Sequence, residues 1–333
     1  MDFRHKSNNN KLALAFVGLA LGIGGLLLAV SAGAKAIPLQ TVLNSIFHYQ
    51  EELDMQLVRD IRIPRAIASA MVGGILGICG AMMQGVTRNP IAEPSLMGIT
   101  QGAMLAIALL YAAPGLFGLA GNTVAALIGS AISGGLVLFF SMKNARSLNV
   151  TKLLLAGTAL STFFISLATV ISLLTNQSQN LAFWVAGGLR SVTWKEAILV
   201  SLTAIIGILL AMLLSKRINI VNLGEDVAVG LGESPGKVRM MTLLLTIPMC
   251  AVAVSISGSI AFVGLIVPHA LRKVVGVDYR FLLPFSALFG AVLLIWADVL
   301  ARLINQPYET PVGLFTSLLG VPFFLWMVRR ERR

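Results

Sequence analysis

The run AILVSLTAIIGILLAMLLS, residues Ala197–Ser215, carries no charged side chain and decides the fold class of this chain. A helix needs about 20 consecutive apolar residues to cross the hydrocarbon core of a bilayer, so the run predicts a membrane-spanning helix. Hydrophobic residues make up 57% of the 333 residues and charged residues only 12%. A soluble domain carries about 25% charged residues. The composition argues against a soluble enzyme, a disordered chain or a nucleic-acid-binding domain, and favours an all-α polytopic membrane protein.

Other uncharged runs place the remaining spans. They are Leu12–Ala34, Ala66–Thr87, Pro94–Met142, Leu153 to the polar stretch Asn176–Asn180, Met240–Pro268, Phe281–Ala297 and Pro311–Val328. Two of these are too long for one helix. Turn formers at Pro114-Gly115 and Gly121-Asn122 divide the third run, and Ser257-Gly258 divides the run that begins at Met240. We predict about ten transmembrane helices, or nine if Met240–Pro268 is one span.

The first run follows a short basic start, and Ala32-Gly33-Ala34 would suit a signal-peptidase site. A signal core has about 7–15 apolar residues. Because the run is longer than that, we expect a helix that is not cleaved.

Basic residues indicate the orientation of the helices. With ten spans, 18 of the 25 Lys and Arg residues fall on the side of the N-terminus. Cytoplasmic segments of membrane proteins are enriched in these residues, and the net charge of +11 fits basic loops that face anionic lipid. We predict one transmembrane domain over residues 1–333, with cytoplasmic tails at 1–11 and 329–333 and a cytoplasmic loop at 216–239. A nine-span chain would place the basic C-terminus outside.

The sequence offers no pattern for catalysis or for a metal. Cys79 and Cys250 lie in apolar runs, where a free thiol behaves as a small hydrophobe. His5, His48 and His269 lack the spacing of zinc ligands. A phosphate-binding loop is missing as well. We expect no catalytic residue, metal or cofactor, and any ATP hydrolysis must belong to another subunit.

Four segments are too unusual to be only lipid-facing. They are RIPR at 62–65, QGVTRNPIAEPSLMG at 84–98, NLGEDVAVGLGESPG at 222–236 and GSIAFVGLIVPHALRKVVGVDYR at 258–280 with the helix that follows it. The arginines of the first either anchor a helix at lipid headgroups or dock an acidic partner. The second predicts a structured turn on the cytoplasmic side, because Glu93 near a membrane boundary must be satisfied. In the last, Asp298 and Arg302 have the i,i+4 spacing of an ion pair.

The segment 222–236 predicts two short helices broken at Gly224, Gly230 and Gly232. Ala228, Val229 and Leu231 would form a small apolar face exposed to the cytoplasm. An exposed apolar face usually marks a partner.

Together, these segments resemble the FecCD family of ABC-transporter permeases, which import vitamin B12, ferric siderophores or haem. The resemblance runs from about Arg62 to Trp326. It rests on RIPR, QGVTRNPIAEP, NLGEDVAVGLG, FVGLIVPHALR, LLPFSALFGA, Ala297-Asp298 with Arg302, and ETPVG at 309–313. It implies the fold of a type II ABC importer permease: a ten-helix subunit that pairs into a homo- or heterodimer around a central path. Two cytoplasmic ATPases would bind below it and an extracytoplasmic binding protein or lipoprotein above it.

The resemblance also implies roles for particular residues. They would lie at the contact with the ATPase, at the contact with the binding protein and along the translocation path. The ATPase-coupling residues would be Leu223, Gly224, Glu225, Ala228, Leu231 and Gly232. The docking residues for the binding protein would be Arg62, Arg65 and Arg302, and the translocation path would include Asn176, Gln177 and Trp184.

The leading hypothesis for function is import of an iron(III)–siderophore complex across the cytoplasmic membrane, driven by the separate ATPase. Haem or cobalamin import is the alternative within the class. A secondary transporter driven by ions would need several ionisable groups near mid-membrane, and the spans are almost free of charge away from their ends. A structural scaffold would not need the 222–236 segment.

The charge distribution generates a prediction about topology. A reporter fused after Arg333, or inserted in the loop between Lys143 and Lys152, should read as cytoplasmic. An extracytoplasmic signal at Arg333 would contradict the ten-span arrangement.

Overall fold

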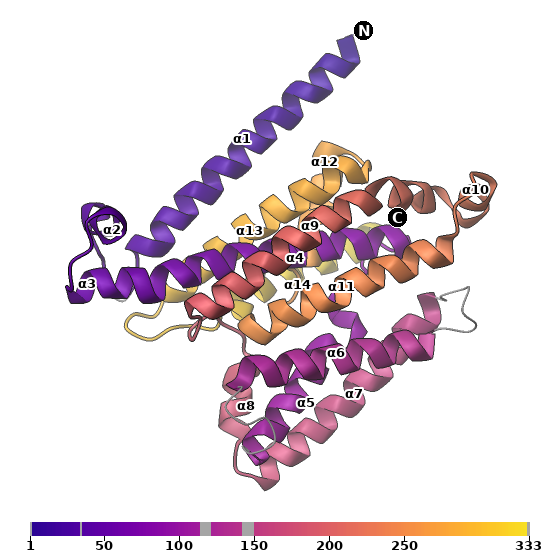
Figure 1. Cartoon of the computed structure of the whole chain (residues 1–333). Helices are drawn as coiled ribbons and strands as arrows, with labels where there is room; N and C mark the ends of the chain where they lie inside the picture. The colour runs from indigo at the N-terminus through magenta and orange to yellow at the C-terminus, as the bar shows by residue number, and fades with distance from the viewer. Residues whose placement is uncertain (1, 34, 114–120, 142–149, 332–333) are drawn as a thin grey trace.

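The computed structural model describes residues 2–33, 35–113, 121–141 and 150–331, and within these ranges all regular structure is helical (Figure 1). Most of the loop around Lys143 and the last two residues lie outside them. The first half contains α1 (Asp2–Ser31), α2 (Leu39–Phe47), α3 (Leu53–Gln56), the π-helix η1 (Leu57–Arg62), α4 (Ile63–Thr87), the 3-10 helix η2 (Pro94–Met97), α5 (Ile99–Ala112), α6 (Gly121–Ser141) and α7 (Val150–Leu174). The second half contains α8 (Ser178–Val185), α9 (Trp194–Leu223), α10 (Glu225–Gly230), α11 (Pro235–Ser257), α12 (Val263–Val275), α13 (Tyr279–Leu303) and α14 (Val312–Glu331).

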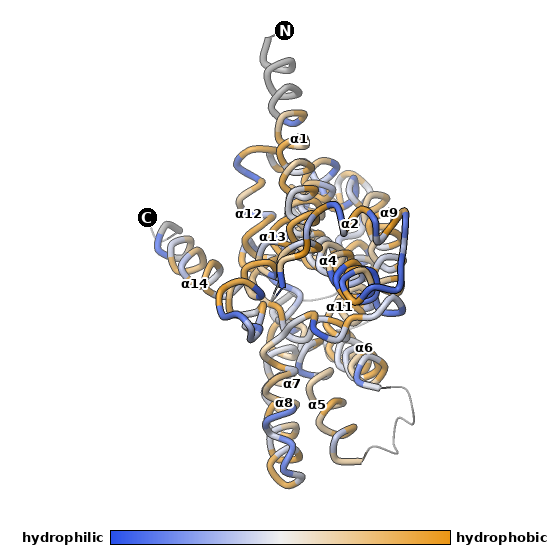
Figure 2. Tube along the Cα trace, turned by 90° about the vertical axis from the view of Figure 1, so that its left-hand side faces the viewer, coloured by the Kyte–Doolittle hydropathy of each residue, from blue (hydrophilic) through white to orange (hydrophobic). Residues whose placement is uncertain are grey.

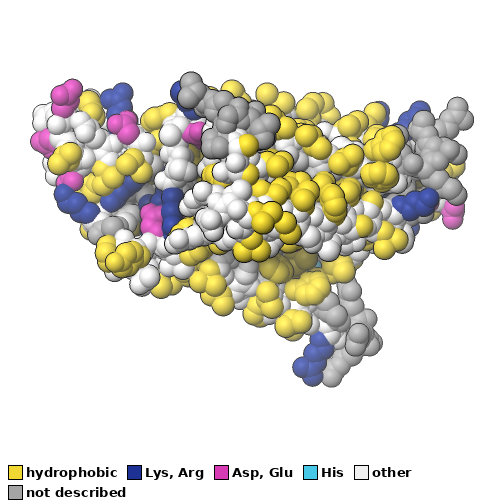
Figure 3. All heavy atoms as spheres, turned by 90° about the horizontal axis from the view of Figure 1, so that it is seen from below, with side chains coloured by type: hydrophobic (Ala, Val, Ile, Leu, Met, Phe, Trp, Pro, Cys, Tyr) yellow, Lys and Arg dark blue, Asp and Glu magenta, His cyan; other side chains and the backbone are white. Residues whose placement is uncertain are grey.

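Ten of these helices are 13 residues or longer: α1, α4, α5, α6, α7, α9, α11, α12, α13 and α14. Seven helical segments are long and apolar enough to cross a membrane, and α5 and α14 contribute shorter apolar helices. Hydrophobic side chains cover the middle of the face seen in Figure 3, whereas charged side chains gather at its two ends. The expectation of an all-α polytopic fold with about ten helices is confirmed.

Both termini lie at the end of the molecule that carries α10, and α2 and α3 lie at the opposite end (Figure 1). We call these the α10 end and the Arg65 end. An even number of long helices places both termini at the same end, and the cytoplasmic location of that end stays a prediction. The division of the run beginning at Met240 is also confirmed, because α11 ends at Ser257 and α12 starts at Val263.

Helix α4 forms the centre of the structure and packs against α9, α11, α12 and α13 (Figure 1). Small residues allow the closest of these contacts, since lipid gives no hydrophobic drive for helices to associate. A methyl group added at Gly73, Gly77 or Gly80 would run into the backbone of α13 or α12, at Gly290, Ser286 or Gly264 respectively. We call α4, α12 and α13, joined by these backbone contacts, the central block.

A second group, α5, α6, α7 and α8, lies alongside α11 (Figure 1). Gly102 of α5 and Gly129 of α6 face each other in the same way, since a side chain on either would meet the other's carbonyl. Helix α1 packs on α13. Figure 2 shows α14 standing apart from the rest at one side.

Several boundaries of the predicted segments differ in detail. Residues 2–11 and 329–331, predicted as parts of cytoplasmic tails, are helical parts of α1 and α14, and their cytoplasmic location stays a prediction. The loop expected at 216–239 is shorter because α9 continues to Leu223. Its extra turns are held by Ile218 and Val221, which are buried.

The predicted span Ala66–Thr87 is part of a longer helical segment. A continuous helical segment runs from Leu53 to Thr87 and includes the π-helix η1 immediately before the proline. A π turn moves the preceding carbonyls away from the place where a proline ring would clash with them, so the helix passes through the RIPR segment.

The central block predicts which glycines tolerate a side chain. Gly80→Ala should lower the melting temperature of the protein in detergent, because the new methyl group meets the Gly264 backbone and overpacking costs about 1–3 kcal/mol. Gly24→Ala in α1, with open space around it, is the matched control. Equal melting temperatures for the two variants would argue against a block joined by backbone contact.

Candidate functional site

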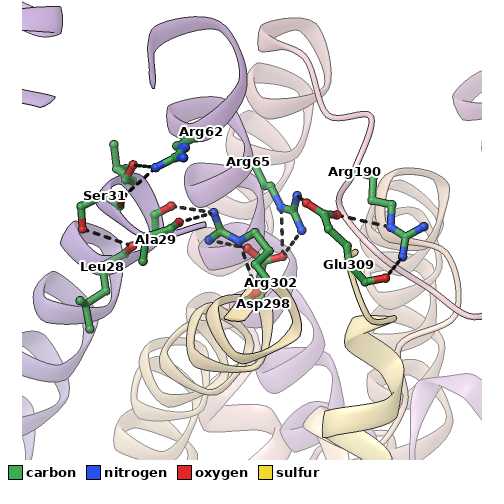
Figure 4. Close-up of polar contacts among 11 residues, drawn as sticks. Leu28, Ala29, Ser31, Arg62, Arg65, Arg190, Asp298, Arg302 and Glu309 are labelled. Atoms are coloured by element: carbon green, nitrogen blue, oxygen red, sulfur yellow. Dashed lines mark hydrogen bonds and ion pairs between the residues drawn. The ribbon is translucent and has the colours of Figure 1, made fainter. Parts of the chain in front are cut away.

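A network of buried charges lies at the Arg65 end, where the start of α4 meets the end of α13 (Figure 4). Asp298 is fully buried and lies between two arginines, with one oxygen 2.9 Å from Arg65 Nη2 and the other 3.0 Å from Arg302 Nη2. Arg65 reaches on to Glu309, 2.7 Å away. Glu309 also pairs with Arg190 at 3.4 Å. The i,i+4 pair between Asp298 and Arg302 is therefore confirmed, and three elements distant in sequence join it.

The same arginines fix the end of α1. Arg62 donates from Nη1 to the carbonyls of Val30 and Ser31 at 3.0 and 2.8 Å, and Arg302 donates from Nη1 to the Ala29 carbonyl at 2.8 Å (Figure 4). The last carbonyls of a helix lack partners within the helix, and a cation also suits the negative end of its dipole. Arg62 and Arg302 thus cap α1 and attach it to α4 and α13.

All three predicted docking arginines lie together at this end, as expected, but their side chains are buried within the single chain. Arg62, Arg65 and Arg302 are 6, 5 and 6% exposed. Their hydrogen bonds go to Asp298, to Glu309 and to α1. This geometry gives each arginine an internal structural partner.

Of the three residues expected along a path, Asn176 and Gln177 lie where α7 turns into α8, and Trp184 lies near the end of α8. Asn176 has a positive φ of 55° and ends the turn, and Gln177 accepts a hydrogen bond from Asn180. Trp184 lines a cavity of about 270 Å³ at the Arg65 end, together with Arg190 and Glu196. Asn176 and Gln177 do not line that cavity.

At the α10 end, the segment 222–236 forms one short helix instead of the two expected. Residues after Leu231 turn directly into α11, which begins at Pro235. Gly224 and Gly232 adopt φ values of 135° and 81°, which favour glycine. These glycines therefore mark the two bends on either side of α10.

The apolar face of α10 differs from the expectation at one residue. Ala228 is fully buried, because α10 packs on α9 and α11. Leu223, Val227, Val229 and Leu231 are the exposed apolar residues, between 48 and 63% accessible. The exposed face is thus present but does not include Ala228.

The segment 84–98 is structured, as predicted, although its first residues up to Thr87 belong to α4; its cytoplasmic location stays a prediction. Glu93 accepts a hydrogen bond from the backbone N–H of Phe262 at 2.6 Å, directly before α12. Gln84 donates to the carbonyl of Gly264 at 3.2 Å. The glutamate therefore has a partner at the start of a helix, where a negative charge is favoured.

A polar cluster ties α9 to the start of α13 at the α10 end. Asn219 of α9 donates to Asp278 at 2.7 Å and accepts from the N–H of Tyr279 at 2.8 Å. Hydrogen bonds from the Arg280 side chain lower the pKa of Asp278 to about 2. A carboxyl group with a lowered folded-state pKa stabilises the fold above its ordinary pKa, and this contribution is lost as the pH falls towards 2.

Sequence reasoning missed two residues of these networks. Glu309 belongs to the ETPVG motif, and a glutamate so close to a predicted span was a signal that it needs a partner. Arg239, at the start of α11, is nearly buried and pairs with Glu225 of α10. Its position in a basic loop gave no such signal.

The family model of the FecCD transport family matches residues 19–330. The chain belongs to this family. FecCD proteins are ABC-transporter permeases, which are not enzymes and work in importers with a separate ATPase and a substrate-binding protein. This chain is accordingly a multi-pass permease of the cell membrane.

Individual relatives agree with the family. The chain is 44% identical over 318 residues to the iron(3+)-hydroxamate import system permease protein FhuB of Bacillus subtilis, covering 95% of this chain and 83% of that protein. It is 35% identical to the hemin transport system permease protein HmuU of Yersinia pestis, covering 96% and 95%. A solved metal-chelate type ABC transporter in an inward-facing conformation matches with a TM-score of 0.82 and 27% identity, covering 95% of this chain and 98% of that one.

The buried network predicts a large loss of stability for Asp298→Asn. The change leaves Arg65 and Arg302 facing each other without the charge between them, and breaking a buried pair costs about 3–5 kcal/mol. Thermal unfolding in detergent measures the effect. Asp54→Asn is the control, since its partner Lys35 is 65% exposed and such pairs contribute about 0–1 kcal/mol. Similar melting temperatures for both variants would show that the network does not hold the fold.

Proposed function

We propose that this FecCD permease imports an iron(III)–siderophore complex, with hydroxamate siderophores as the first class to test. The observation that supports this substrate most strongly is the 44% identity to a permease named for iron(3+)-hydroxamate import. Haem is the alternative within the class, supported by the 35% identity to a hemin permease.

The distribution of charge supports an orientation with the α10 end in the cytoplasm. The ten-span assignment puts eighteen of the 25 Lys and Arg residues on the side of the N-terminus, which the positive-inside rule places in the cytoplasm. The N-terminal helix α1 begins at the α10 end (Figure 1). The Arg65 end then faces outward, where a binding protein or lipoprotein delivers the substrate. We expect a second FecCD subunit, identical or not, and two ATPase subunits to complete the transporter.

Helix α10 is the proposed contact with the ATPase. It projects at the cytoplasmic end between two glycine bends (Figure 1). The side chains of Val227, Val229 and Leu231 are apolar, and about half or more of each remains exposed in the described part of the chain. Such a face fits an apolar cleft in a partner protein.

The role of Arg62, Arg65 and Arg302 in docking stays a prediction. Carboxylates of a binding protein would pair well with guanidinium groups. Because the three side chains are buried, an incoming carboxylate would have to compete with Asp298 or with the carbonyls of α1. Substitution of one of these arginines by glutamate distinguishes the two roles. Loss of affinity for the binding protein at an unchanged melting temperature would support docking, whereas a lowered melting temperature with unchanged affinity would limit these residues to a structural role.

The coupling surface predicts the effect of a charge on α10. Val229→Asp should abolish uptake and copurification of the ATPase while insertion and melting temperature stay unchanged, because an unpaired carboxylate cannot be desolvated in an apolar contact. Val277→Asp is the control, since Val277 is 65% exposed between α12 and α13. Normal uptake by the Val229→Asp variant would remove α10 from the ATPase contact.

Uptake by cells tests the substrate. A strain that lacks this chain should fail to take up radiolabelled iron as its desferrioxamine B complex, and the gene should restore uptake. Haemin and iron(III) citrate serve as comparison substrates. Restored uptake of haemin alone would contradict the siderophore proposal and support the alternative.

A further inference from the structure

Arg239 is the feature of the α10 end that the proposed function leaves unused. It lies in the first turns of α11, and its side chain is only 10% exposed although the surroundings are a cytoplasmic loop. One side of its guanidinium pairs with Glu225 in the first turn of α10. The other side donates from Nε to the carbonyl of Val86 at 3.0 Å, in the last turn of α4.

We infer that Arg239 is the positioning residue that transmits movement of α10 to the central block. The inference deepens the proposed function, since it rests on α10 being the contact with the ATPase. Arg239 touches neither nucleotide nor substrate and acts through the two helices that it joins.

The chemistry of the two contacts suits a rigid connection. The Val86 carbonyl is among the last of α4, which lack intrahelical partners, and it lies at the negative end of the helix dipole. A guanidinium group presents its donors in one fixed plane, so a bond on each side fixes both helices relative to the same plane. A movement of Glu225 would therefore be passed to the end of α4.

Helix α10 also packs on α9 and α11 through the buried Ala228, an apolar contact without directional bonds. The remaining connections described beside α10 are weaker than the pair formed by Arg239. The bend at Gly224 has a conformation that favours glycine, with φ at 135°, and a glycine is free to change its backbone angles. The ion pair between Arg217 and Glu233 is 3.6 Å long, and its arginine is 48% exposed. Exposed pairs of this kind contribute little.

The central block would carry the signal through the membrane. Its helices touch at backbone atoms, at Gly73 against Gly290, Gly77 against Ser286 and Gly80 against Gly264. At its far end, Arg65 of α4 binds Asp298 of α13. A displacement of Val86 therefore has a stiff route to the Arg65 end.

Helix α11 packs on α4 and also on α6 of the second group. Its contact with α6 is formed by a side chain, unlike the backbone contacts within the central block. A methyl group on Gly134 of α6 would meet the side chain of Ile247, which provides the three nearest atoms, the closest at 2.7 Å. Side chains can change rotamers while packed backbones cannot. We place the relative movement of the two groups at this contact between α6 and α11.

The test uses the assembled transporter in proteoliposomes, with the iron chelate that the wild-type protein imports among desferrioxamine B, citrate and haemin complexes. Arg239→Met removes the contacts of the guanidinium with Glu225 and Val86. Lys237→Met is the matched control, since Lys237 lies two residues earlier and is exposed. Glu225→Gln removes the ion pair and leaves the bond from Arg239 to Val86 in place.

Arg239→Met should keep ATPase copurification and ATP hydrolysis but lower the amount of chelate imported per ATP by roughly tenfold, a usual size for coupling between sites. Glu225→Gln should lower the same ratio. Arg239→Lys should recover part of the loss because it retains the charge. Lys237→Met should behave as wild type.

Three outcomes would overturn the inference. A normal ratio of chelate to ATP in Glu225→Gln would show that α10 does not act through Arg239. Loss of assembly in Arg239→Met with normal coupling in Glu225→Gln would assign Arg239 a structural role only. Loss of coupling in the Lys237→Met control would show that the effect is not specific. Failure of the proposed function looks different, because Val229→Asp would then still bind the ATPase.

Discussion

The structure depends on one constraint, which is that a bilayer offers no hydrogen-bond partner to a buried polar group. Asp298 can be fully buried only because Arg65 and Arg302 lie on either side of it. Satisfying that carboxylate brings the beginning of α4 to the end of α13, and the remaining donors of Arg302 fix the end of α1. The folded position of three helices thus follows from a single buried charge.

Glycine residues are the second requirement of the fold. The ion pairs at the helix ends do not determine how closely the middle parts of the helices pack against each other. The contacts of Gly73, Gly77 and Gly80 leave no room for a side chain between α4 and its neighbours. Helix α4 is therefore held by polar pairs at the Arg65 end, by backbone contact along its length and by Arg239 at the α10 end. A permease driven by an ATPase on one side of the membrane needs such a connection to reach the other side.

The sequence predicted the fold class, the number of long helices, the break near Ser257 and the Asp298–Arg302 pair, because each depends on local hydropathy or on spacing along one helix. It failed where distant segments decide the result. The length of α9 depends on the burial of Ile218 and Val221, and the burial of Ala228 depends on α9 and α11. The arginines 62, 65 and 302 were placed at one end correctly, but their internal partners on α1 and at Glu309 could not be read from spacing.

The central claim is that the central block, together with its packed neighbour α11, moves as one body against the helices around α6. A cysteine pair at Gly134 and Ile247 would link α6 to α11, and a pair at Gly22 and Val292 would link α1 to α13, both at positions in contact. The variants are made with Cys79 and Cys250 replaced by alanine, and uptake is measured before and after oxidation. The account predicts that the α6–α11 disulfide stops uptake until it is reduced, whereas the α1–α13 disulfide leaves uptake unchanged. Normal uptake with the α6–α11 disulfide formed would contradict it.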